Sequence, residues 1–246
     1  MKLPSRVTLV DVGPRDGLQN EKQQVDAAVK IELVHRLQAA GLREIEVTSF
    51  VSPKWVPQMA DNAAVMAGIA RKAGVRYSVL TPNLKGFEAA LLCKPDEIVV
   101  FGAASEAFSQ RNINCSIEES IERFRPVVAA AHDNGIKVRA AVSCALGCPY
   151  QGEVSADEVE RVVVLMKAIG VDHCGIADTI GVGTRGTAPM PFINVFGQKE
   201  YQQVPVDIDE DTLTKVAEKT GGKYFRADNS ESMRKIYAEI DRLEKT

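Results

Sequence analysis

The sequence lacks several features that would assign it to a particular class of protein. It has no CxxC pair, its five cysteines are an odd number, and its only histidines are His35, His132 and His173. This cysteine pattern favours free thiols in a reducing compartment over a disulfide framework. Cys144 and Cys148 are close in the sequence, but no second pair or nearby histidine completes a zinc site, so a structural zinc is not expected.

Long apolar runs and an excess of charge of one sign are also missing. No run approaches the roughly 18–20 residues that a membrane helix needs, and the first residues lack the apolar stretch of a signal peptide. With 30 basic and 33 acidic residues, the formal net charge of −3 gives no electrostatic case for nucleic acid. We therefore expect a cytoplasmic protein with neither a membrane nor a nucleic-acid partner.

The sequence does contain a repeated alternation of strand-like and helix-like segments. Several strand-like segments are apolar on both faces, as in Ile98–Phe101, which suits a parallel sheet covered by helices. Successive βα units predict an α/β fold derived from the (β/α)₈ TIM barrel, with a doubly wound sheet as the alternative. Strands are expected at 7–12, 44–48, 76–80, 97–101, 137–143 and 173–177, and helices at 26–40, 59–72, 84–91, 117–134 and 155–169.

The pattern changes after Thr184. Residues 185–206 contain three prolines and no helical period, which predicts a hairpin or an extended ribbon around Gly197–Lys199. An eighth barrel strand, if the fold has one, would have to come from this region. A helix at 209–219, a strand at 223–227 and a helix at 230–245 are expected to follow.

Charged side chains occur at or just beyond the ends of three predicted strands. Arg15 and Asp16 come directly after the first strand, Glu46 lies on the second, and Asp178 follows the sixth. Because the carboxyl ends of barrel strands form the active-site face, the three acids could converge on one cation or substrate. The Arg15 guanidinium would then hold a developing oxyanion. The alternatives are an ion pair that ties down a loop and acids that only cap helices.

Residues 1–184 resemble the 3-hydroxy-3-methylglutaryl-CoA (HMG-CoA) lyases, a family of divalent-metal enzymes with the (β/α)₈ fold. The resemblance implies C–C cleavage of HMG-CoA to acetyl-CoA and acetoacetate, and therefore an acyl-CoA ligand. It also implies that Asp16 is a ligand of Mg²⁺ or Mn²⁺, that Arg15 stabilises the enolate of acetyl-CoA, and that Glu46 and Asp178 are acids of the catalytic site. The matching stretches are Gly13–Glu21, Thr48–Met59, Pro82–Gly86, Ala104–Glu106, Asn112–Ser120, Val142–Tyr150 and Asp178–Thr184.

Residues 179–246 resemble instead the C-terminal part of a bacterial von Willebrand factor A domain. Because Thr179–Thr184 fits both resemblances, we interpret the chain as a chimera. A partial lyase barrel over 1–184 would be joined to a von Willebrand factor A-like segment over 185–246, the two packed as one structural unit. The segment would complete the sheet with its strand and helices. The stretches that carry this second resemblance are 179–189, Val206–Glu210, Ala217–Phe225 and Ser230–Lys245.

Some characteristic features of the lyase family have no counterpart in this sequence. The family has a His-x-His metal pair on its seventh strand and a reactive cysteine in a glycine-rich loop, whereas the last histidine here is His173 and the last cysteine is Cys174. We therefore expect an inactive hybrid on a lyase scaffold, which could form a homodimer along an open sheet edge. The alternatives are an acyl-CoA lyase with full or residual activity and a rebuilt metal site, and a non-enzymatic interaction module.

Overall fold

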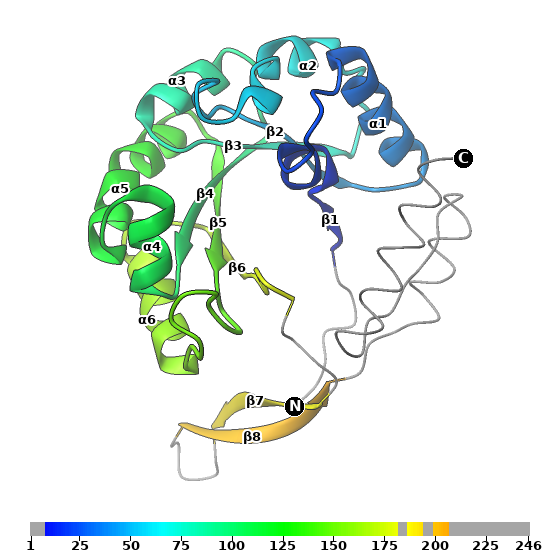
Figure 1. The fold of residues 1–246 in the computed structure, drawn as a ribbon. Coiled ribbons are helices and arrows are strands. Elements are labelled where there is room, and N and C mark those ends of the chain that lie inside the picture. The colour runs from blue at the N-terminus through cyan, green and yellow to red at the C-terminus, as the bar shows by residue number, and fades with distance from the viewer. Residues whose placement is uncertain (1–7, 182–185, 194–198, 207–246) are drawn as a thin grey trace. The chain divides into compact units, whose positions relative to one another are not determined.

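The computed structural model describes residues 8–181, 186–193 and 199–206, which fall into two units. The larger unit, residues 8–181, is a curled parallel sheet whose convex side is covered by helices (Figure 1). Within the described residues, no helix is both long enough and apolar enough to cross a membrane.

The strands of the larger unit lie in the sheet in chain order, and every neighbouring pair is parallel. A doubly wound sheet reverses its strand order at a switch point. No reversal occurs among these strands, so the doubly wound alternative is wrong and the barrel-derived fold is confirmed as a six-stranded half-barrel. The strands are β1 (Val10–Asp11), β2 (Glu44–Ser49), β3 (Arg76–Leu80), β4 (Glu97–Ala103), β5 (Lys137–Ser143) and β6 (His173–Ile176).

The helices mostly follow the predicted pattern. α2 is shorter than expected because Ile69 adopts an extended conformation and ends it. α4 was not predicted, since it is largely polar; the Ser105 side chain caps its start and Asn114 ends it in a left-handed conformation. The helices are α1 (Ala27–Ala39), α2 (Asn62–Gly68), α3 (Leu84–Leu91), α4 (Glu106–Ile113), α5 (Ile117–Asp133) and α6 (Ala156–Ala168), with short turns η1 (Gly13–Gly17) and η2 (Pro57–Met59).

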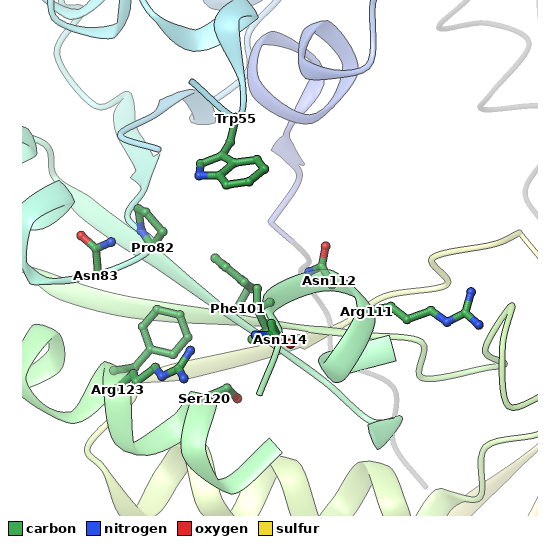
Figure 2. A pocket seen from close by; sticks show the side chains of 11 residues that line it. Trp55, Pro82, Asn83, Phe101, Arg111, Asn112, Asn114, Ser120 and Arg123 are labelled. Atoms are coloured by element: carbon green, nitrogen blue, oxygen red, sulfur yellow. The ribbon is translucent and has the colours of Figure 1, made fainter. Parts of the chain in front are cut away.

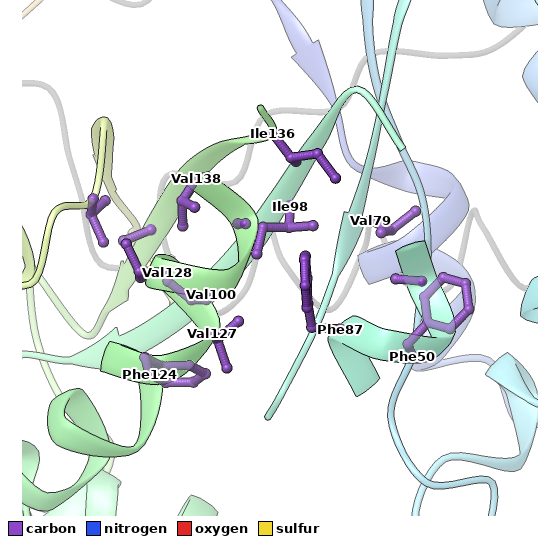
Figure 3. Packing of buried hydrophobic residues seen from close by; sticks show 14 of the residues in the cluster. Phe50, Val79, Phe87, Ile98, Val100, Phe124, Val127, Val128, Ile136 and Val138 are labelled. Carbon is purple, nitrogen blue, oxygen red and sulfur yellow. The ribbon is translucent and has the colours of Figure 1, made fainter. Parts of the chain in front are cut away.

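The hydrophobic core lies between the sheet and these helices (Figure 3). Alternate residues of β4 and β5, including Ile98, Val100 and Val138, pack against Phe124 and Val127 of α5. Burial of each such side chain stabilises the fold by about 1.5–3 kcal/mol. The residues between them on each strand are therefore left to face the concave side of the sheet, where charged groups occur.

The smaller unit confirms the hairpin predicted for 185–206. β7 (Gly186–Ile193) pairs antiparallel with β8 (Lys199–Val206), from Gly186 opposite Val206 to Ile193 opposite Lys199. The two form a sheet of their own, so among the described strands this region does not provide an eighth barrel strand. The helices and the strand expected between 209 and 245 lie outside the described residues.

The capping box of α6 provides a test of the fold. Ser155 Oγ accepts a hydrogen bond from the Glu158 amide at 3.2 Å, and a Glu158 carboxylate oxygen accepts one from the Ser155 amide at 2.7 Å. The Ser155→Ala variant is expected to lose about 1 kcal/mol of the free energy of unfolding, measured by urea denaturation. Ser155→Thr, which keeps the hydroxyl, should lose much less; an equal loss in both variants would contradict a capping role.

Candidate active site

Arg15 and Asp16 lie in η1, the turn that follows β1. Their amides donate to the Val12 carbonyl at 3.1 and 2.7 Å, and Pro14 at the start of the turn is buried. The tight turn sends the two side chains in different directions: that of Arg15 is 12% exposed, whereas that of Asp16 is 55% exposed. The arginine is therefore inside the site and the aspartate at its surface.

Glu46 lies on β2, and its side chain is only 1% exposed. Ile45 and Val47 on either side belong to the core beneath the helices, which places Glu46 on the concave side of the sheet. The pairing of β2 with β3 shifts register between Glu46 and Thr48, as in a β-bulge. Bulges are frequent next to active sites, where they redirect side chains.

Five charged side chains, which we call the ionic chain, connect η1 to the interior of the sheet. Arg15 Nη1 lies 2.6 Å from Asp16 Oδ1, and Arg15 Nε lies 2.5 Å from Glu46 Oε1. The other Glu46 oxygen, Oε2, lies 2.7 Å from Arg139 Nη2, and Arg139 Nε lies 3.1 Å from Glu97 Oε2. The charges alternate in sign along the whole chain, so each buried charge has an opposite charge beside it.

Arg139 and Glu97 were not among the predicted site residues. Arg139 lies on β5 between Val138 and Ala140, whose side chains are buried against the helices. Burial disfavours the charged guanidinium, but the adjacent carboxylates of Glu46 and Glu97 outweigh this and raise the pKa of Arg139 above its ordinary value. The available signal was a charged residue in the middle of an otherwise apolar strand.

Asp178 lies in the exposed segment that follows β6, as the sequence predicted. This segment is attached to the end of β5 and the turn after it by three hydrogen bonds, one of which runs from the Ala177 amide to the Val142 carbonyl at 2.9 Å. The Ala145 amide donates to the Ala177 carbonyl at 3.1 Å, and the Cys144 amide donates to Thr179 Oγ1 at 2.7 Å. The position of Asp178 therefore depends on the turn that begins at Cys144.

The predicted metal site is not complete among the described residues. Both carboxylate oxygens of Glu46 already accept hydrogen bonds from arginines, and Asp16 Oδ1 accepts one from Arg15. Divalent cations need several oxygen ligands held in place. Over 8–181 and the two strands of the hairpin, no three His, Cys, Asp or Glu side chains are placed to hold a metal. The expected convergence of Asp16, Glu46 and Asp178 on one cation is thus not formed there.

The three histidines lie in helices or at the start of a strand. His35 in α1 accepts a hydrogen bond from the Ala70 amide at 2.9 Å, and His132 in α5 lies 3.1 Å from Asp172 Oδ2. His173 is the first residue of β6, at the end of the strand away from the ionic chain's Arg15 and Asp16. None of them belongs to the ionic chain.

A pocket of about 560 Å³ lies beyond the carboxyl end of β3 and beside β4 (Figure 2). Trp55, 80% exposed, projects toward the space between Pro82 and Asn112. The size is typical of small-molecule sites, and the lining combines aromatic rings, amides and two guanidinium groups. The lining residues are Trp55, Pro82, Asn83, Phe101, Arg111, Asn112, Ile113, Asn114, Ser120, Arg123 and Phe124.

The half-barrel, with its ionic chain and pocket, defines an α/β-barrel type of protein with a polar site that extends from the turn after β1 along the concave side of the sheet. The chain belongs to the HMGL-like family, whose model matches residues 6–195. The 3-hydroxy-3-isohexenylglutaryl-CoA/hydroxy-methylglutaryl-CoA lyase of Pseudomonas aeruginosa is 59% identical over 186 residues, covering 76% of this chain and 62% of the relative. The mitochondrial hydroxymethylglutaryl-CoA lyase of Homo sapiens is 56% identical over 184 residues, covering 75% of this chain and 57% of the relative.

Solved structures agree with this assignment. The crystal structure of the Pseudomonas aeruginosa hydroxymethylglutaryl-CoA lyase has a TM-score of 0.73 at 59% identity and covers 75% of this chain and 61% of its own. An HMG-CoA lyase from Acinetobacter baumannii, solved with coenzyme A and 3-methylmalate, has a TM-score of 0.68 at 32% identity and covers 72% of this chain and 58% of its own. The chain thus spans 57–62% of the length of these relatives.

These comparisons confirm the resemblance to the lyases and correct its limits. The family match extends to residue 195, past the junction expected at residue 184. The comparisons support neither a von Willebrand factor A-like segment over 185–246 nor a chimeric origin, and the division into 1–184 and 185–246 stays a prediction. Related lyases are named cytoplasmic in Danio rerio and mitochondrial in Homo sapiens, so the expected cytoplasmic location also stays a prediction.

Proposed function

We propose that the chain is an active C–C lyase of 3-hydroxy-3-methylglutaryl-CoA or a close 3-hydroxyacyl-CoA, in place of the inactive hybrid expected from the sequence. The observation that carries the proposal is the immobilised guanidinium of Arg15. It is held by Glu46 on the concave side of the sheet and by Asp16 at the surface. The names of the relatives support the substrate class.

Arg15 has the role of stabilising the enolate that leaves when the C–C bond breaks. The electron pair of that bond forms the C=C bond of the enolate, and the π electrons of the thioester carbonyl move onto its oxygen, which becomes negatively charged. Nε and Nη1 of Arg15 are bonded to Glu46 and Asp16, so Nη2 is the nitrogen assigned to this oxygen. A donor fixed before the reaction need not reorganise when the charge develops, which makes it effective in catalysis.

Glu46 and Asp178 have different roles in this proposal. Glu46 is a positioning residue, since Arg15 and Arg139 bind both of its oxygens and leave it poorly suited to accept a substrate proton. Asp178, exposed at the carboxyl end of β6, is assigned the 3-hydroxyl proton. Loss of that proton and cleavage of the C–C bond convert the hydroxyl-bearing carbon into the ketone of acetoacetate, and the enolate carbon takes up one proton to give acetyl-CoA.

The pocket beside β4 is the proposed place for the CoA part of the substrate. The exposed Trp55 ring can stack on the adenine base, and Arg111 and Arg123 can attract phosphates. The lyase of Acinetobacter baumannii was solved with coenzyme A, which supports this ligand class. The lyase resemblance also implies Mg²⁺ or Mn²⁺ at Asp16; because the described residues do not complete that site, the proposal assigns the cation no step.

The proposed function is tested by HMG-CoA cleavage in the presence of Mg²⁺ or Mn²⁺. Acetyl-CoA and acetoacetate should form in equal amounts, and Asp16→Ala should lower kcat by roughly 10²-fold or more, because one of the groups holding Arg15 is lost. Glu122→Ala, which removes an exposed acid of α5, is the control and should keep full activity. A cooperatively folded protein without turnover would contradict the proposal and favour an inactive scaffold.

A further inference from the structure

The sulfur of Cys148 lies among hydrogen-bond donors from two separate segments of the chain. Ser105 Oγ, at the start of α4, lies 3.0 Å from Cys148 Sγ, and the amides of Tyr150 and Gln151 each donate to it at 3.4 Å. Cys148 is only 3% exposed. Neither the fold nor the proposed reaction accounts for so many donors on one thiol.

The direction of these hydrogen bonds makes the sulfur an acceptor. A backbone amide can only donate, so Tyr150 and Gln151 both require a lone pair on the sulfur. Ser105 Oγ already accepts the Phe108 amide at 3.1 Å as the cap of α4, which leaves its hydroxyl hydrogen for Cys148. Burial alone would raise the pKa of Cys148, but these hydrogen bonds outweigh it and lower the pKa, so the thiolate is favoured.

Cys144, at the start of the turn that leads to Cys148, provides a second thiol four residues before the first. Its side chain is fully buried, and its backbone has a φ of 60° in the turn that ends β5. Burial and the adjacent Cys148 raise the pKa of Cys144 to about 11, which keeps it protonated beside the thiolate. A favoured thiolate with a neighbouring thiol is the arrangement of an oxidation-sensitive pair.

We propose that Cys148 and Cys144 form a peroxide-reactive pair, in which Cys148 is the attacking thiol and Cys144 the resolving one. The Cys148 thiolate attacks one oxygen of hydrogen peroxide; an S–O bond forms, the O–O bond breaks and hydroxide leaves. Cys144 then attacks the resulting sulfenic acid; the S–S bond forms, the S–O bond breaks, and the hydroxide takes the Cys144 proton as water. Both cysteines have free thiols in this structure.

The buried thiols lie beside exposed residues of the same segment. Leu146 and Tyr150, within and just beyond the turn between the two cysteines, are 54% and 50% exposed. Closing the disulfide would move Cys144, whose amide is bonded to Thr179 next to Asp178. Oxidation is therefore expected to loosen the segment that carries Asp178. The disulfide does not depend on the proposed lyase function, but an effect on turnover would rest on it.

The proposal predicts that Cys148 reacts with peroxide before Cys93 and Cys174. Cys93 and Cys174 are more exposed than Cys148, so access alone predicts that they react first. Burial raises the pKa of both above that of an ordinary thiol, which lowers their reactivity. The order in which the cysteines react therefore shows whether hydrogen bonding to the sulfur or exposure to solvent controls their reactivity.

The test is treatment of the full chain with hydrogen peroxide, followed by alkylation in denaturant and peptide mass spectrometry. The expected product is a 144–148 disulfide formed before any change at Cys93 or Cys174. Cys144→Ser should instead trap a sulfenic acid on Cys148 that dimedone labels, and Cys148→Ser should give neither product. First oxidation at Cys93 or Cys174, with Cys144 and Cys148 recovered as free thiols, would overturn the proposal.

The hydrogen bond that Ser105 donates to Cys148 can be tested separately. Ser105→Gly removes the hydroxyl and keeps an acceptable helix cap, and it should slow oxidation of Cys148 by roughly 3–10-fold. Ser109→Ala is the matched control, because this buried serine of α4 donates to the Cys115 carbonyl and not to sulfur. In the wild type, oxidation should also speed amide exchange at 177–179. Equal oxidation rates in both serine variants would contradict the assigned donor.

Discussion

The Arg15→Gln variant is expected to fold and to lose HMG-CoA turnover by roughly 10²–10³-fold, the loss typical for removal of one preorganised donor to a developing oxyanion. Glutamine can still donate one hydrogen bond to Glu46, so the interior of the sheet keeps most of its pairing. It cannot at the same time reach Asp16 and present a positive charge to the substrate. The expected loss is therefore mainly in kcat, measured by steady-state formation of acetyl-CoA.

Arg15→Lys separates charge from geometry. Lysine keeps the positive charge but lacks the planar fork that binds Glu46 and Asp16 at 2.5 and 2.6 Å. It should recover only a small part of the lost activity. Full recovery in Arg15→Lys would show that charge alone is needed, and an unchanged kcat in Arg15→Gln would contradict the assigned role of Arg15.

Much of the larger unit was predictable because its strands and helices have strong local patterns. Ile98–Phe101 is apolar on both faces, and the parallel order of the strands follows from the helices between them. α4 lacked such a pattern and depends on the Ser105 cap and on the left-handed Asn114. The end of α2 at Ile69 reflects a backbone conformation that residue type alone does not determine.

The site was predictable only in part, because its partners lie far apart in the sequence. Local patterns place Arg15 and Asp16 just beyond the first strand and Glu46 on the second, and the structure brings these three together through the Arg15 guanidinium. The Glu46–Arg139 contact joins residues 93 positions apart. To predict this contact, one would need to know how the sheet curls and which face of β5 carries Arg139. Composition and periodicity give neither.

Arg139→Met is expected to destabilise the fold by about 3–5 kcal/mol, because removal of one partner leaves buried charge without compensation. Glu46 and Glu97, whose side chains are 1% and 7% exposed, would lose the guanidinium between them. The free energy of unfolding, measured by denaturant titration, should show the loss at neutral pH.

The double variant Glu46→Gln, Arg139→Met tests whether that loss comes from charge. Removing both charges should recover part of the stability lost in Arg139→Met, although Arg15 then keeps only a neutral partner on β2. Arg76→Met is the matched control, because Arg76 pairs with Glu44 near the other end of β2 with its side chain 47% exposed, and should cost at most about 1 kcal/mol. A loss in Arg139→Met that is not reduced in the double variant would mean that packing of the arginine side chain, and not its charge, holds β2, β4 and β5 together.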